Sequence, residues 1–130
     1  MTRPVKLGAT CFINVDLVFS GGADFFESFR YEQRLENGGH EGVDISEWDA
    51  FMAFAKGNQL VLQCDECLST DEDGFVHVHL TPDVTSQLPK GMYDYNIVLR
   101  DNNGAIISFV EGEATVSRII PVIPDEEQEH

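Results

Sequence analysis

Two pairs of metal-binding side chains stand close together in the sequence. Cys64 and Cys67 form a Cys-x-x-Cys pair, and His77 and His79 follow on the next expected strand, residues 75–80. Two cysteines at this spacing are half of a zinc site, and histidines two residues apart on a strand share one face at about 6.5–7 Å. Because apolar residues alternate with the histidines, we expect the histidines to face solvent and the thiols to be partly buried. The sequence therefore predicts neither a bound metal nor a cofactor.

The loop 65–74 between these pairs is acidic. From Ser69 onward it resembles the first half of an EF-hand calcium loop, but the twelfth position, which needs a bidentate glutamate, is Leu80. A looser calcium site of carbonyl and carboxylate oxygens stays open, and an acidic hairpin tip is the alternative. Asp65 and Glu66 should raise the pKa of the neighbouring thiols, since a reactive thiolate needs positive surroundings. Thiol redox chemistry is therefore not expected.

Catalytic motifs are absent from the sequence. It holds no nucleophile elbow, no His-Glu-x-x-His zinc motif and no glycine-rich nucleotide loop. Cys11 lies in an alternating stretch, which is typical of a core residue and not of a nucleophile. Carboxylates are so abundant that no particular pair stands out as a general acid and base. We therefore expect a protein that is not an enzyme.

Charge and length narrow the function classes further. The chain has 130 residues, 23 acidic and 8 basic side chains, and a formal net charge of −15. This charge repels nucleic-acid phosphates and anionic membranes, so neither is an expected partner. The length fits one domain, and no apolar stretch is long enough to span a bilayer. Polar residues interrupt the N-terminal apolar stretch, so a secretory signal is not expected, and an odd count of 3 cysteines indicates a reducing compartment.

The pattern of elements predicts an all-β protein. Most of the chain alternates apolar and polar residues with a period of two, which is typical of half-buried strands. Residues 43–56 are ambiguous, and we favour a bend around 45–48 followed by a short strand. Thr81 and Pro82 predict the start of one short helix that ends before Pro89. The expected strands are residues 10–19, 24–34, 59–63, 75–80, 93–100, 106–110 and 114–120, with turns at 36–42, 102–104 and 111–112.

These strands predict an antiparallel immunoglobulin-like β-sandwich of seven to eight strands with one short helix. Residues 1–120 form the single domain, with residues 1–9 as an extended arm, and residues 121–130 are a proline-containing acidic tail. Both ends carry apolar residues without an obvious place inside a sandwich. The interface candidates are therefore Val5, Leu7, Ile119, Ile120, Val122 and Ile123.

Three residues are expected to shape the core. Trp48 should be buried and fill the space between the sheets, as a large ring does in many sandwiches. Leu88 to Tyr93 resembles a tyrosine corner, in which the phenol hydroxyl bonds back to the backbone a few residues upstream. Leu88 and Tyr93 are therefore predicted core and corner residues with a structural role.

Several stretches of the sequence form a familiar order: Gly21-Gly-Ala-Asp-Phe-Phe-Glu-Ser-Phe29, Val43-Asp-Ile-Ser-Glu-Trp48, Ala50-Phe-Met52, Gly74-Phe-Val-His-Val-His-Leu-Thr-Pro82, Thr85-Ser-Gln-Leu-Pro-Lys-Gly-Met-Tyr-Asp-Tyr95, Asp101-Asn-Asn-Gly104 and Val110-Glu-Gly-Glu-Ala-Thr-Val116. This order resembles that of small structural proteins of tailed-bacteriophage virions, and the layout is similar to the N-terminal domain of baseplate upper proteins. The resemblance covers residues 5–120. The Cys-x-x-Cys loop and the acidic tail depart from the pattern.

The resemblance implies a virion part without catalytic residues. We expect a building block of the tail, neck or baseplate, assembled in the bacterial host cytoplasm, which holds neighbouring subunits together. Its partners would be other virion proteins and itself, in a ring or symmetric collar. Two alternatives stay open: a head decoration or head-fibre protein, and a receptor- or carbohydrate-binding module that uses Trp48 or the loop 65–74.

Overall fold

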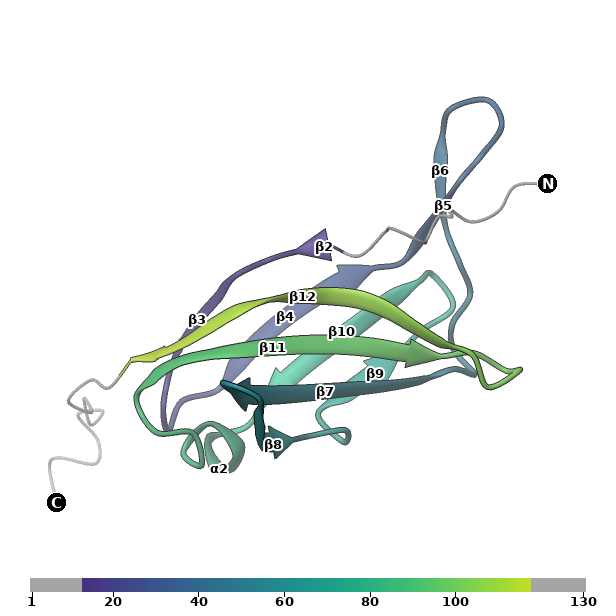
Figure 1. The fold of residues 1–130 in the computed structure, drawn as a ribbon. Helices are drawn as coiled ribbons and strands as arrows, with labels where there is room; N and C mark the ends of the chain where they lie inside the picture. Colours follow the sequence, from purple (N-terminus) through teal and green to yellow (C-terminus); the bar gives the residue numbers. More distant parts are fainter. Residues whose placement is uncertain (1–12, 118–130) are drawn as a thin grey trace, which may run out of the picture.

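The structure is a computed structural model that describes residues 13–117, and it consists of two facing β-sheets (Figure 1). The larger sheet has the order β2-β12-β11-β7-β8, with β3 also paired to β12. The smaller sheet has the order β4-β10-β9, and β5 pairs with β6 in a separate hairpin. The strands are β2 (Ile13–Asn14), β3 (Leu17–Ser20), β4 (Phe25–Arg30), β5 (Glu32–Arg34), β6 (His40–Gly42), β7 (Asp49–Lys56), β8 (Gln59–Gln63), β9 (Leu68–Thr70), β10 (Phe75–Leu80), β11 (Gly91–Arg100) and β12 (Ile106–Ser117). This architecture confirms the predicted all-β sandwich.

The side chains that fill the space between the two sheets come from alternate positions along the strands. In β10 every second residue is buried from Val76 to Leu80, and in β11 from Tyr93 to Leu99. The residues in between face outward, because successive side chains of a strand point to opposite faces. The largest fully buried side chains are Phe54, Ile45, Met52, Leu80, Ile97 and Leu99.

The one helix among residues 13–117, α2 (Pro82–Thr85), lies where Thr81 and Pro82 predicted it. Its Thr85 is completely buried, and its hydroxyl donates to the carbonyl of Ala23 at 2.9 Å and accepts from the amide of Gly22 at 2.9 Å. These bonds tie α2 to the turn between β3 and β4. In the described part of the chain, no helix is long and apolar enough to cross a membrane.

The C-terminal strand differs from the prediction. The expected turn at 111–112 does not exist, because β12 runs without a break from Ile106 to Ser117. Pairing on both sides explains this: β12 pairs with β11 from Ile106 to Val116, with one register shift at Ile97/Val98, and with β2 and β3 on its other side. The β2 and β3 pairings are parallel, so the larger sheet is mixed and not antiparallel throughout.

Two predicted strands are divided in the structure. The stretch 10–19 yields β2 and β3, which keep one register along β12. Between them the Asp16 carboxylate, and not a backbone carbonyl, accepts the Glu113 amide at 3.0 Å. The stretch 24–34 yields β4 and β5, with Tyr31 between them donating its amide to the carbonyl of Gly74 at 2.7 Å. The described residues therefore contain more strands than the seven to eight expected.

Candidate functional site

The two histidines lie on the outer face of the smaller sheet, as the alternation predicted. The His77 ring lies 2.9 Å from an oxygen of Asp71 and 2.9 Å from the Ser28 hydroxyl. His79 lies 2.9 Å from an oxygen of Asp24, and its ring stacks on Phe26 at 4.3 Å between centroids. Each histidine therefore links β10 to a neighbouring segment through its own partners.

The two thiols lie on the inner side of the sandwich. Cys64 is buried, and Cys67 is half-buried and packs against the core. Burial raises the pKa of the Cys64 thiol to about 12, with smaller contributions from the neighbouring Cys67 and from the carboxylates of Asp65 and Glu66. From the sequence we expected this rise in the thiol pKa to come from the two carboxylates, but burial is the larger cause. A thiol of this kind is a poor nucleophile.

The structure does not bring the two pairs together. The thiols pack on the core side, whereas the histidine side chains lie on the outer face of the smaller sheet. The two halves of the hypothetical zinc site therefore lie on opposite sides of this sheet. Among residues 13–117, no three histidine, cysteine or carboxylate side chains are grouped so that they could hold a metal ion. The geometry therefore offers no support for a metal centre here.

The acidic loop is organised by one carboxylate. One oxygen of Asp71 accepts the backbone amides of Asp73 at 2.9 Å and Phe75 at 3.0 Å, and the other lies beside His77. The hydrogen bond with His77, followed by those with the amides, lowers the pKa of the Asp71 carboxyl. This carboxylate is committed to folding the turn into β10, which is the structural role of an Asx-turn.

Trp48 is not the buried plug that the sequence predicted. It is half-buried, and its ring packs against Tyr31 at 5.7 Å between centroids, with the two ring planes tilted by 55°. Ile45, which is completely buried, fills the core at this bend instead. The bend directs Ile45 inward and leaves Trp48 at the rim of the sandwich, beside an open hollow that Phe51 and Arg100 also line.

Leu88 and Tyr93 lie in the core, each with 3% of its surface exposed. The Tyr93 hydroxyl donates to the carbonyl of Pro89, four residues upstream, which is the arrangement of a tyrosine corner. Tyr95 makes a second bond of this type, donating its hydroxyl to the carbonyl of Val15. The two phenols thus fasten the first half of β11 to two different segments, the turn before it and the chain at Val15.

The burial of Tyr95 has a consequence for stability at high pH. Burial raises the pKa of this phenol to about 12 from an ordinary value of 10.0, with the carboxylates of Asp16 and Glu27 adding to the effect. The raised pKa contributes stability that is complete below pH 10 and is lost as the pH rises toward 12. We expect the free energy of unfolding to fall over this range, and to fall less steeply in Tyr95→Phe. Denaturant titrations at several pH values would test this, and equal slopes in both proteins would contradict it.

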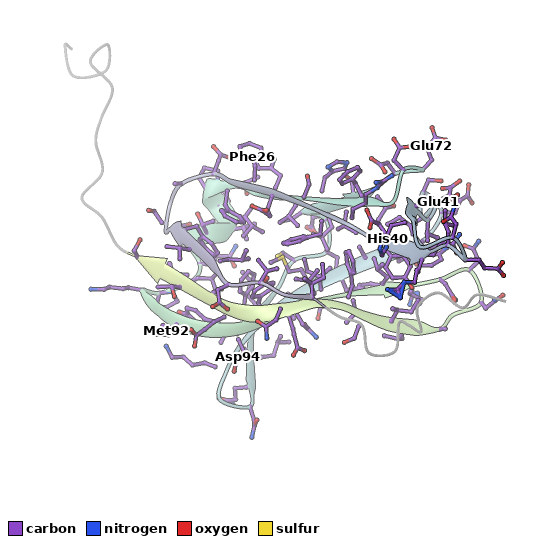
Figure 2. The ribbon with its side chains drawn as sticks, turned by 90° about the horizontal axis from the view of Figure 1, so that it is seen from above. Phe26, His40, Glu41, Glu72, Met92 and Asp94 are labelled. Carbon is purple, nitrogen blue, oxygen red and sulfur yellow. The ribbon has the colours of Figure 1, made fainter. Side chains whose placement is uncertain are left out.

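A hairpin projects from the sandwich; the sequence analysis had placed its first strand at the end of the strand 24–34 and the rest of it in a turn at 36–42. β5 and β6 pair from Glu32↔Gly42 to Arg34↔His40, and Figure 1 shows them extending beyond the two sheets. The base is held by the bond from the Val43 amide to the Tyr31 carbonyl at 3.0 Å. We name residues 32–42 the projecting hairpin; His40 and Glu41 lie on it in Figure 2.

A second feature that sequence analysis missed is a hollow on the outer face of the larger sheet. It has a volume of about 660 Å³ and extends across β7, β11 and β12 to Asn14 of β2 and the following Asp16. We name it the outer hollow, and it is lined by Asn14, Asp16, Ala53, Ala55, Asp94, Tyr95, Asn96, Glu111, Gly112 and Glu113. Figure 2 shows Asp94 on this side of the molecule, opposite Phe26. The alternation of Asp94 with Asn96 and of Glu111 with Glu113 was visible in the sequence, but their juxtaposition required the strand register.

The six interface candidates, Val5, Leu7, Ile119, Ile120, Val122 and Ile123, lie outside the described residues, as does Cys11. Their expected role as docking segments is unaffected by the geometry of residues 13–117.

Comparison with known proteins supplies little beyond this geometry. No protein family matches the chain, and no curated protein matches its sequence. Among solved structures, the crystal structure of CopC from Methylosinus trichosporium OB3b is similar, with a TM-score of 0.44 and 12% sequence identity over 88% of this chain and 93% of that chain. At this level the similarity supports no statement about the site or the function, and the fold rests on the sheet topology described above.

Proposed function

We propose that this protein is a non-enzymatic structural subunit of a bacteriophage particle, placed in the tail, neck or baseplate. The observation that carries the proposal is the projecting hairpin, residues 32–42. A two-stranded hairpin is only marginally stable alone, and this one extends away from the core that would support it. A neighbouring subunit that packs against the hairpin would supply the missing support. The resemblance of the sequence to small virion proteins favours the same role.

An open sheet edge provides a second contact of this kind. β8 ends the strand order of the larger sheet, so its outer edge has no partner strand among residues 13–117. Leu60 on this strand is 63% exposed and Val61 is 39% exposed, and the strand carries no charge. An uncharged apolar edge is suited to strand addition by a partner. This supports a subunit that is joined to its neighbours through edges and arms.

Shortening the hairpin tests the proposal. The register Gln33↔Glu41 allows residues 34–40 to be replaced by Asn-Gly, which closes a two-residue turn without disturbing β4 or Val43. We expect this variant to keep its melting temperature and to lose incorporation into particles, as measured by immunoblotting of purified virions. Asn58→Ser, at the exposed turn between β7 and β8, is the matched control and should be incorporated normally.

The C-terminal segment is tested in the same assay. Deleting residues 119–130 should also abolish incorporation at an unchanged melting temperature, because the branched aliphatics there would dock on a neighbour. Normal incorporation of both truncated proteins would reject the proposed contacts.

One observation favours a second candidate, a receptor- or carbohydrate-binding module. Phe26 is 66% exposed on the outer face of the smaller sheet and stacks on His79, which forms a small aromatic platform. Aromatic faces of this kind bind sugar rings and flat side chains. Loss of host-cell adsorption in Phe26→Ala, with particles of normal composition, would favour this candidate over a purely structural role.

A further inference from the structure

The outer hollow has a floor of small residues and a rim of carboxylates. Ala53 and Ala55 of β7 form the floor beside Asn96 and Asp94, so this part of the outer face leaves room for side chains from outside. On the rim, Asp94 of β11 lies directly opposite Glu113 of β12 in the strand register. The shape therefore accepts an extended segment, and the rim favours a positively charged one.

The opposed carboxylates are unfavourable in the free subunit. Like charges directly opposite each other across an antiparallel pair destabilise a sheet. Within residues 13–117 no ion pair neutralises Asp94, Glu111 or Glu113. A cation from outside the described part of the chain would remove this repulsion, and burial of the site under an apolar segment would strengthen the attraction.

The cations of the sandwich itself are mostly engaged elsewhere. Arg30 pairs with Glu32 at 3.3 Å, Arg100 pairs with Asp49 at 2.8 Å, and the Lys56 ammonium lies over the Tyr93 ring at 4.6 Å. The first fifteen residues are different in composition, because they contain Arg3 and Lys6 and no carboxylate. They also contain the apolar residues Val5 and Leu7, one on each side of Lys6.

We propose that residues 1–12 of a second copy of this chain dock in the outer hollow, with the cationic stretch 3–6 beside the Asp94–Glu113 rim. The direction of β2 favours a second copy over the same one. Ile13 pairs with Val110 and Asn14 with Glu111 in a parallel ladder. The N-terminal end of β2 therefore points along β12 away from Glu113. A segment of a second copy can enter the hollow from its open side without any change at β2. Twelve residues are enough to cross it, since a chain of that length spans up to roughly 40 Å when extended. This inference rests on the proposed role as an assembly subunit.

A charge-swap experiment on the full-length protein tests the pairing. One variant carries Asp94→Lys and Glu113→Lys, and the other carries Arg3→Glu and Lys6→Glu. In each variant alone, the hollow and the arm carry charges of the same sign and should repel each other. In a mixture of the two variants, the hollow of one is complementary in charge to the arm of the other. The mixture also has the same total charge as two wild-type copies. A control variant, Glu66→Lys with Glu72→Lys, makes the same change of charge at exposed positions away from the hollow.

Sedimentation velocity at low ionic strength measures the association. We expect the wild type and the control to self-associate, each swapped variant to do so at least tenfold more weakly, and the mixture to recover association that high salt removes. A mixture that stays monomeric, or swapped variants that associate like the wild type, would overturn the inference. Incorporation of both swapped variants into particles at normal levels would overturn it too, while leaving the proposed virion role intact.

Discussion

Truncating Phe54 to alanine should lower the free energy of unfolding by about 3–5 kcal/mol, because it removes a large ring from the centre of the core. Phe54 is completely buried, and its ring contacts Phe19 at 6.2 Å and Tyr95 at 6.3 Å between centroids. It lies on β7, which connects β11 to β8, so the cavity would open between the two sheets. Neither neighbour can fill that cavity without leaving its own packing position.

Denaturant unfolding measures this loss. The matched control is Phe26→Ala, which removes the same ring from a position that is 66% exposed and should change stability by at most about 0.5 kcal/mol. Similar losses for the two variants would show that the core is not centred on Phe54. Trp48→Ala should fall between the two, because Trp48 is half-buried at the rim.

The second large effect is expected at Gly112 of β12. A Cβ atom at this position would lie 2.1 Å from the carbonyl oxygen of Val15, far inside contact distance, and the backbone would have to move. Val15 is held there by two bonds, since its amide donates to Glu111 at 2.9 Å and its carbonyl accepts the Tyr95 hydroxyl. We expect Gly112→Ala to lower the free energy of unfolding by about 1–3 kcal/mol, as overpacking does elsewhere.

Gly21→Ala is the control for this change. Its added Cβ would meet the carbonyl oxygen of Thr85 at 3.5 Å, an ordinary contact distance, so the melting temperature should change much less. Thermal unfolding of both variants makes the comparison. Equal melting temperatures for Gly112→Ala and the wild type would mean that β2 does not lie against β12 as described.

Sequence reasoning predicted the strands whose burial pattern is regular. β10 and β11 alternate regularly, so the bounds of β10, the C-terminal end of β11 and the outward histidines followed from the period of two, whereas β11 begins two residues before the predicted start at 93. The short helix also followed from local chemistry, because Thr81 and Pro82 act within one turn. Where residues adjacent in the sequence determine the local conformation, the sequence was sufficient to predict the element.

The remaining features depend on contacts between distant parts of the chain. Glu111 and Gly112 look like a turn, but β12 continues through them because β11 and the N-terminal strands pair on both sides. Trp48 and Ile45 are both plausible core residues by type, and only the direction of the bend decides that Ile45 is buried.

The candidate surfaces were hidden from sequence analysis for the same reason. The residues of the outer hollow come from four separate strands or turns, and their meeting requires the register Asp94↔Ala55 on one side and Asp94↔Glu113 on the other. The projecting hairpin reads as a glycine-rich turn, since its strands are only three residues each and carry no apolar alternation.

Electron microscopy of the purified particle tests the central claim most directly. A density map at a resolution that shows strands can be searched for two facing sheets with a projecting hairpin at residues 32–42. The proposed role predicts this density at a symmetric position in the tail, neck or baseplate, with the hairpin or the chain ends in contact with neighbouring subunits. A complete map that accounts for every tail, neck and baseplate protein and leaves no place for this chain would contradict it.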